Sequence, residues 1–197
     1  MTSFDVHTID TAPHDSKPLL QHSQDLYDGM IPNLHGVMAE SPALLEAYQK
    51  LNEVSQKMSL DSIETNIVWL AINYENGCDY CMAAHTAIAQ FAGLDDGDID
   101  ALRNKLPLSD PKHQALRHFT GQTVQARGWV DDAAIEALLA EGYSRATVLD
   151  VILRIGMKTM SNCTNHVDHT PDDSPFSHFT WNNTTQLATH KLTRAIK

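Results

Sequence analysis

Two cysteines and a histidine lie close together in the segment Glu75-Asn76-Gly77-Cys78-Asp79-Tyr80-Cys81-Met82-Ala83-Ala84-His85. Cys78 and Cys81 are three residues apart and Cys81 and His85 are four apart, so a helix would place all three side chains on one face. Cys78 would lie in the first turn, where free N–H groups and the helix dipole favour a thiolate. His85 would act as the base for a thiol, and the second thiol would close a disulfide. The segment therefore predicts thiol-based redox chemistry.

The same three side chains could instead bind zinc, with Cys163 or His166 as the fourth ligand. Structural zinc sites favour two short paired motifs, whereas the second half here is a single Cys-x-x-His in an otherwise apolar helix. An inert, buried cysteine pair is a third interpretation. The redox interpretation is preferred, and it requires neither a metal nor a cofactor.

Charge and composition exclude several classes of protein. The chain has 197 residues, of which 14 are basic and 25 acidic, and its formal net charge is −11. No Lys or Arg occurs between Met58 and Leu102, so the sequence lacks the basic stripe that nucleic-acid binding needs. The longest apolar run, Ile67 to Ile72, is too short to span a bilayer, and the start has no signal-peptide features. Three cysteines do not suit an extracellular disulfide framework. We expect a cytoplasmic protein that binds neither nucleic acid nor membranes.

The elements that would position the cysteines are predicted to be helices. Residues 1–33 are rich in proline and polar residues and are expected to form an arm, followed by a helical domain over 34–180 and a tail over 181–197. Gly77 should end one helix, and the next should run from near Cys78 to Gly93. No segment alternates as a strand does, so the fold class is all-α. Helix starts are indicated by capping residues at Ser41, Asp61 with Glu64, Asp110, Asp131 and Ser144.

The helix that follows Ser144 is apolar on nearly every side. It carries Val148, Leu149, Val151, Ile152, Leu153, Ile155, Met157 and Met160. Such a helix is either central to its domain or lies at a subunit interface.

The cysteine motif, Glu-x-x-Cys-x-x-Cys-x-x-x-His after an apolar helix, resembles the alkylhydroperoxidase D-like branch of the carboxymuconolactone decarboxylase family. The later stretch Lys158 to His166, then Thr170-Pro171 and Asp173, also resembles that branch, with Cys163 in place of a common Tyr. The resemblance covers roughly residues 30 to 180.

This resemblance implies a compact multi-helix bundle that assembles as a homo-oligomer, whether dimer, trimer or hexamer. It also implies a peroxidase whose substrate is a hydroperoxide. Cys81 would be the peroxidatic thiol, Cys78 would resolve its sulfenic acid as a disulfide, and His85 would relay the proton. An external dithiol or a redox partner protein would then reduce the disulfide. The helix dipole alone slightly favours Cys78 as the attacking thiol, so the choice of Cys81 rests on the resemblance and on its proximity to His85.

Two positions depart from the pattern of that branch. Its relay Glu lies twelve residues before the first cysteine, where this chain has Asn66, and it often has His between the cysteines, where this chain has Tyr80. Glu75 is a candidate to replace the relay carboxylate, and a solvated surface charge is the alternative interpretation of that residue. Both departures predict a weak or specialised peroxidase activity.

Two other functions remain open. Lactone decarboxylation, within the same family, would need a cationic pocket for an anionic substrate, which Arg154, Lys158 or a neighbouring subunit could supply. A non-enzymatic helical protein with a structural zinc site at the cysteine pair is the other alternative.

Overall fold

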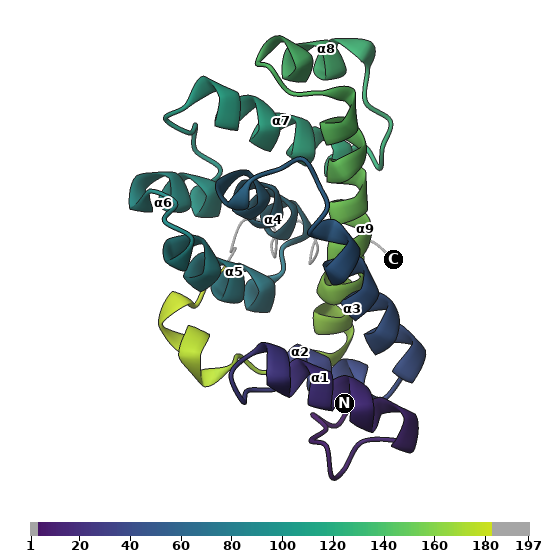
Figure 1. The fold of residues 1–197 in the computed structure, drawn as a ribbon. Coiled ribbons are helices and arrows are strands. Elements are labelled where there is room, and N and C mark those ends of the chain that lie inside the picture. The colour runs from purple at the N-terminus through teal and green to yellow at the C-terminus, as the bar shows by residue number, and fades with distance from the viewer. Residues whose placement is uncertain (1–3, 183–197) are drawn as a thin grey trace, which may run out of the picture. The chain divides into compact units, whose positions relative to one another are not determined.

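The computed structural model describes residues 4–182 (Figure 1). The chain divides into two compact units, one formed by residues 4–60 and 144–175 and the other by residues 61–143 and 176–182. Every regular element in the described part is helical, which confirms the all-α fold class. None of the helices in that part is long and apolar enough to cross a membrane.

The unit that holds the cysteine motif is built around helix α4, Ser62–Asn76, which lies between α7 and α5. Its helices also include α5 (Asp79–Phe91), α6 (Asp96–Asn104), α7 (Pro111–Gln125) and α8 (Asp132–Ala140). The core of this unit joins Ile67 and Leu70 of α4 to Met82 of α5 and Leu102 of α6. Trp181 closes this core and donates its indole N–H to the carbonyl of Arg103.

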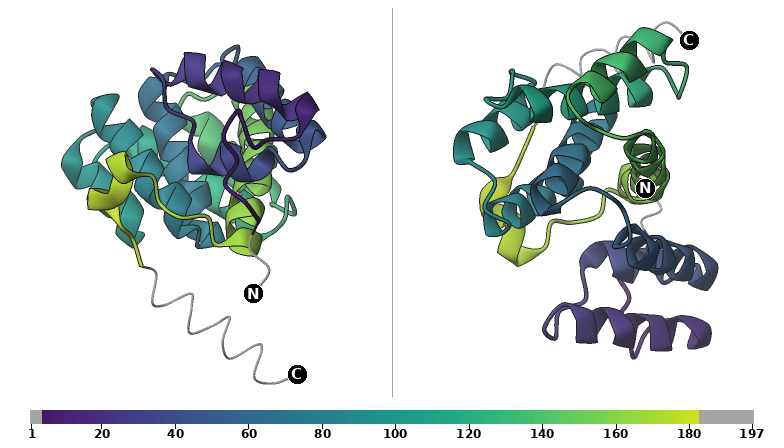
Figure 2. Two further views of the ribbon diagram at one scale, coloured as in Figure 1. Left: turned by 90° about the horizontal axis from the view of Figure 1, so that it is seen from below. Right: turned by 45° about the horizontal axis from the view of Figure 1, so that its top comes forward.

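The other unit contains α1 (Lys17–Leu26), α2 (Asn33–Met38), α3 (Pro42–Ser55) and α9 (Arg145–Asp168). Short 3₁₀ helices precede α1 at His14–Ser16 and follow α9 at Ser174–Phe179. Figure 2 shows α1, α2 and α3 packed together in the purple-to-blue part of the ribbon. Both α2 and α3 pack on α9.

The helix boundaries follow from the capping residues that the sequence indicates. Asp61 and Glu64 form a capping box at the start of α4, and Gly77 ends that helix in the left-handed region with φ 66°, which glycine adopts without strain. The other predicted N-cap side chains each accept a backbone N–H at the start of a helix: Ser41, Asp110, Asp131 and Ser144. These contacts confirm the predicted helix starts.

The N-terminal segment differs from the expected arm because it contains the ten-residue helix α1. Only Leu20 and Ser23 of this short helix are buried. Polar contacts from residues outside α1 help to hold it: Gln49 of α3 donates to the carbonyl of Leu19 and to the hydroxyl of Ser23, and Ser23 also bonds His35. Such long-range polar contacts leave no local signal in the sequence. The tail expected over 181–197 lies outside the described residues, apart from Trp181 and Asn182.

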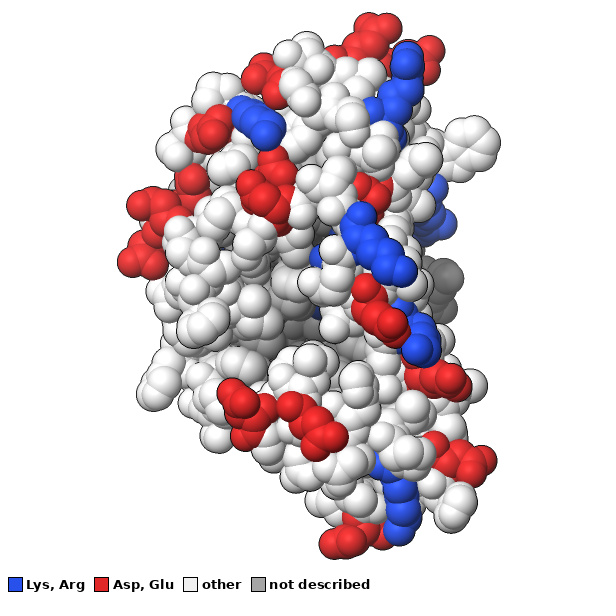
Figure 3. All heavy atoms as spheres, viewed as in Figure 1, with Lys and Arg blue, Asp and Glu red and all other residues white. Residues whose placement is uncertain are grey.

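Positive and negative side chains are interspersed on the face drawn in Figure 3, and that face carries no broad basic patch. The distribution agrees with the acidic composition of the chain.

Candidate thiol site

The turn between α4 and α5 places Cys78 at the N-cap of α5, with an extended backbone (φ −92°, ψ 101°). Its N–H donates to the carbonyl of Asn73 at 3.1 Å, and its carbonyl accepts from Met82 at 2.9 Å. Cys78 is completely buried. Its backbone is thus fixed from both sides, by the end of α4 and by the first turn of α5.

Cys81 lies inside the first turn of α5 and is 2% exposed. N–H groups at this position have no acceptor earlier in their own helix, so the local field is positive and favours an anion. The sequence placed Cys78 in the first turn, whereas the structure places it one position before the helix and Cys81 within the turn. The helix terminus therefore favours a thiolate at either cysteine.

Asn73 ties the two cysteines together. Its carbonyl accepts the Cys78 N–H, and its side-chain Nδ2 donates to the carbonyl of Cys81 at 3.1 Å. Asn73 is itself completely buried. One residue of α4 therefore sets the position of both cysteine backbones.

His85 is half-buried on α5, one helical turn after Cys81. Its ring lies against the indole of Trp69 on α4, with ring centroids 4.5 Å apart and planes at 44°. This contact restricts the rotation of the imidazole. Sequence reasoning missed both Trp69 and Asn73, although Asn66, Trp69 and Asn73 recur at helical spacing on one face of α4, a signal that could have found them.

Glu75 is not the solvated charge that one interpretation of the sequence offered, because its side chain is only 8% exposed. Its carboxylate lies 2.9 Å from Nζ of Lys105 and accepts from Nε2 of Gln125 at 2.7 Å. A β-carbon added to Gly121 would lie 3.2 Å from Oε1 of Glu75, so this glycine leaves room for the carboxylate against α7. The contacts give Glu75 a role in joining α4 to the end of α6 and to α7.

Asn66 is 2% exposed and donates its Nδ2 to the carbonyl of Ser62 at 2.9 Å. Within residues 4–182 no hydrogen-bond donor reaches its Oδ1. Glu64, two residues earlier, points elsewhere: it closes the cap of α4 and pairs with Lys112 at 2.8 Å. The face of α4 that carries Trp69 and Asn73 therefore has no carboxylate from either residue, because Asn66 is an amide and the Glu64 side chain points elsewhere.

Residues 4–182 contain no group of three or more His, Cys, Asp or Glu side chains arranged to hold a metal ion. The two residues considered as a fourth zinc ligand, Cys163 and His166, are both exposed on α9. The zinc interpretation therefore gains no support from the geometry of these side chains.

The segment from the first turn of α3 to the start of α8 can be compared with known families. Residues 42–132 match the carboxymuconolactone decarboxylase family. The matched residues include the cysteine motif and every contact of Asn73, Trp69 and Glu75 described above. The match confirms the resemblance that the motif indicated.

Solved structures with the same fold include uncharacterized peroxidase-related proteins from two bacteria. That from Ralstonia eutropha JMP134, described as an alkylhydroperoxidase AhpD core, has a TM-score of 0.77 and 21% identity, over 88% of this chain and 93% of that one. The protein from Silicibacter sp. TM1040 has a TM-score of 0.74 and 19% identity, over 89% and 93% of the two chains.

The debrominase Bmp8, solved as a cysteine-to-alanine variant with 2,3,4-tribromopyrrole, also shares the fold. Its TM-score is 0.71 at 14% identity, over 88% of this chain and 92% of that one. A search of curated protein sequences gave no significant match. The structural likenesses show that the chain has the AhpD-like fold, which this debrominase shares.

Proposed function

We propose that this protein is a thiol-dependent peroxidase that reduces alkyl hydroperoxides through the pair Cys78 and Cys81. The observation that carries the proposal is the placement of the pair at the start of α5, with both backbones tied to Asn73 and His85 one turn further on. The family match and the AhpD-like fold support it.

In the first step, the thiolate of Cys81 attacks the terminal oxygen of the hydroperoxide. An S–O bond forms while the O–O bond breaks, and the alkoxide leaves as the alcohol after it takes a proton from His85. Cys81 is thereby oxidised to a sulfenic acid, and the hydroperoxide is reduced to an alcohol. The ring contact with Trp69 holds the imidazole of His85 for this transfer.

In the second step, the thiol of Cys78 attacks the sulfenic sulfur of Cys81. The S–S bond forms, and the hydroxyl group leaves as water with the proton of the Cys78 thiol. Because Asn73 fixes both backbones, the second sulfur is in place when the first has reacted. An external dithiol or a redox partner protein then reduces the disulfide and restores both thiols.

Glu75 enters the proposal as the carboxylate that replaces a relay Glu, because the chain has Asn66 at the usual relay position and an amide cannot relay a proton as a carboxylate does. Its pairing with Lys105 and Gln125 keeps the carboxylate in a fixed position. Cys81, Cys78, His85 and Glu75 thus form the proposed catalytic set, and the proposed mechanism needs neither a metal nor a cofactor.

The test is intact mass and thiol counting on reduced, metal-free protein after one equivalent of an alkyl hydroperoxide. The proposal predicts a loss of two hydrogen atoms, one alkylatable thiol at Cys163, and a peptide that joins Cys78 to Cys81. Three alkylatable thiols after exposure would refute it. Lactone decarboxylase activity and zinc content would then become the properties to measure.

A further inference from the structure

Helix α9 buries several polar side chains and exposes several large apolar ones. Arg154 and Lys158 are at most 2% exposed, and Asn162 follows them on the buried side. Three large apolar side chains face outward instead: Leu149 is 66% exposed, Ile152 is 51% exposed and Val167 is 69% exposed. The sequence predicted either a central helix or a subunit interface. Exposed apolar side chains aligned on one helix are typical of an interaction surface.

Gly156 lies at the midpoint of this exposed face and of the 24-residue helix. Glycine is unfavourable inside a helix, and a β-carbon added to Gly156 would meet no atom of this chain within 4 Å. The packing of the chain itself therefore does not require glycine at this position. A second helix that crosses at this point would require it, because a small residue lets two helices approach closely.

We infer that α9 packs antiparallel against α9 of a second copy of this chain, about a two-fold axis at Gly156. In an isologous contact, residues at equal distances from the axis face each other. Leu149 lies seven residues before Gly156 and Cys163 seven residues after it; Ile152 and Met160 lie four residues to either side. The exposed face is thus self-complementary, with an apolar or small side chain opposite another.

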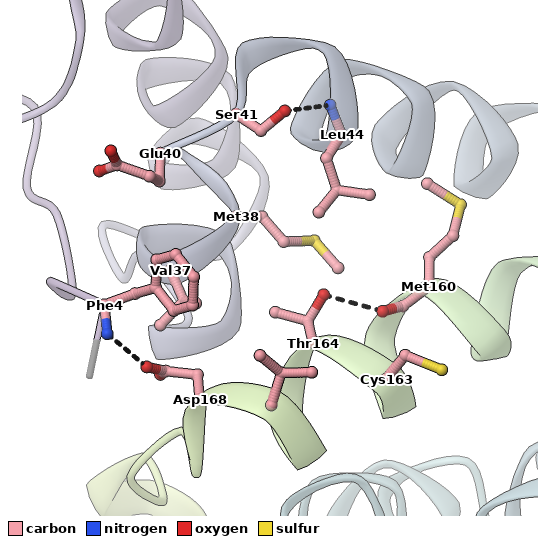
Figure 4. Close-up of a pocket in the computed structure, with 11 residues that line it drawn as sticks. Phe4, Val37, Met38, Glu40, Ser41, Leu44, Met160, Cys163, Thr164 and Asp168 are labelled. Atoms are coloured by element: carbon pink, nitrogen blue, oxygen red, sulfur yellow. Dashed lines mark hydrogen bonds between the residues drawn. The ribbon is translucent and has the colours of Figure 1, made fainter. Parts of the chain in front are cut away.

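A cavity beside the exposed face fits this register. It has a volume of about 420 Å³, and Asp168 and four preceding residues of α9 line one wall: Met160, Cys163, Thr164 and Val167 (Figure 4). These four residues have the spacing of the four-sided hole that receives one side chain of a facing helix. Leu149 of the second copy, opposite Cys163, would enter this hole, and Met38 and Leu44 line the cavity beyond it.

The charges at the two ends of α9 also favour the antiparallel arrangement. The carboxylates of Glu40 and Asp168 line the same cavity, at the C-terminal end of the helix. Arg145 is the first residue of α9 and is exposed. An antiparallel partner brings its Arg145 to these two carboxylates, and it also aligns the two helix dipoles favourably.

The first experiment is disulfide trapping with the variant Leu149→Cys and the native Cys163, under mild oxidation of the full-length protein. The proposed register predicts a covalent dimer that contains a peptide linking position 149 to Cys163 of the other copy. Adding Cys163→Ser should abolish this product. Val54→Cys is the matched control, because Val54 is 45% exposed on α3 and should give no covalent dimer.

A dimer linked through Cys163 to Cys163 would overturn the antiparallel register, as would the absence of any product from Leu149→Cys.

The second experiment is light scattering of the double variant Leu149→Asp with Ile152→Asp. In the proposed register the two carboxylates would be buried against Cys163 and Met160 of the other copy, with no partner for their charge, so the molar mass should fall to half that of the parent assembly. Val54→Asp should leave the mass unchanged. Both altered residues are exposed in the single chain, so circular dichroism should show an unchanged fold. Three results would each contradict the proposal. The parent protein could be a monomer of 21.9 kDa, it could be a trimer without two-fold contacts, or the double variant could keep the mass of the parent.

Discussion

Replacing Asn73 by Ala tests whether this residue positions the two cysteines. The change removes the bond from Nδ2 to the Cys81 carbonyl, 3.1 Å long and between completely or almost completely buried residues. It leaves the backbone bond between Asn73 and Cys78 in place. Losing one buried hydrogen bond should lower the free energy of unfolding by about 1–2 kcal/mol. For a chain of this length each kcal/mol lowers Tm by about 2–4 °C, so Tm should fall by about 2–8 °C.

The same variant should slow disulfide formation, because the sulfur atoms depend on backbone positions that Asn73 sets. Misplacement of reacting groups by an ångström can cost about 100-fold in rate, so we expect oxidation to be about 10- to 100-fold slower. The assay follows alkylatable thiols after one equivalent of an alkyl hydroperoxide, beside thermal unfolding by circular dichroism.

Asn104→Ala is the matched control for Asn73→Ala. Asn104 is exposed, and among residues 4–182 its Nδ2 bonds only to Asp100, in the same helix. Its removal should change stability by less than about 0.5 kcal/mol and leave the oxidation rate unchanged. An Asn73 variant that loses stability but oxidises at the parental rate would refute the positioning role.

Three further variants test the proposed relay and the effect of burial on stability. His85→Gln should slow oxidation about 100-fold or more, most strongly near neutral pH, and an unchanged pH–rate profile would remove His85 from the mechanism. Glu75→Gln should slow oxidation at least about tenfold. Lys105→Met breaks the same ion pair but keeps the carboxylate, which Gln125 still holds, and should stay within about twofold of the parent; equal rates for the two variants would leave Glu75 only its structural role. Burial, and to a lesser extent the nearby His22, lowers the pKa of His35 to about 4. The unfolded chain therefore binds the extra proton first, and stability should fall by about 3 kcal/mol as the pH drops from about 6.5 to 4. Urea unfolding of the parent and of His35→Gln over that range measures this slope, and equal slopes would show that His35 is not its source.

Local signals in the sequence determine much of this fold. A side chain such as Ser144 or Asp110 accepts a backbone N–H within a few residues, so the start of a helix can be predicted without knowledge of the tertiary structure. Helix α1 could not be predicted in this way, because Gln49 and His35 hold it from distant parts of the chain.

The candidate site could likewise be predicted only in part from the local sequence. The spacing of Cys78, Cys81 and His85 follows from helical geometry, and the structure places all three at the start of α5 or one turn along it. The partners of these residues depend on how α4 packs on α5. Nothing local indicates that Asn73 bonds Cys81 or that Trp69 lies against His85. The sequence likewise could not predict which side chains of α9 are buried, because a helix with apolar residues on nearly every side does not show which face packs against the rest of the chain.

The central claim is that Cys81 reacts with the hydroperoxide and Cys78 resolves the product. The most direct measurement compares Cys78→Ser with Cys81→Ser after one equivalent of an alkyl hydroperoxide, with a sulfenic-acid-selective probe and peptide mapping. The proposal predicts a labelled sulfenic acid at Cys81 in the Cys78→Ser protein, and no consumption of peroxide by Cys81→Ser. Peroxide consumption by Cys81→Ser at the parental rate would contradict it.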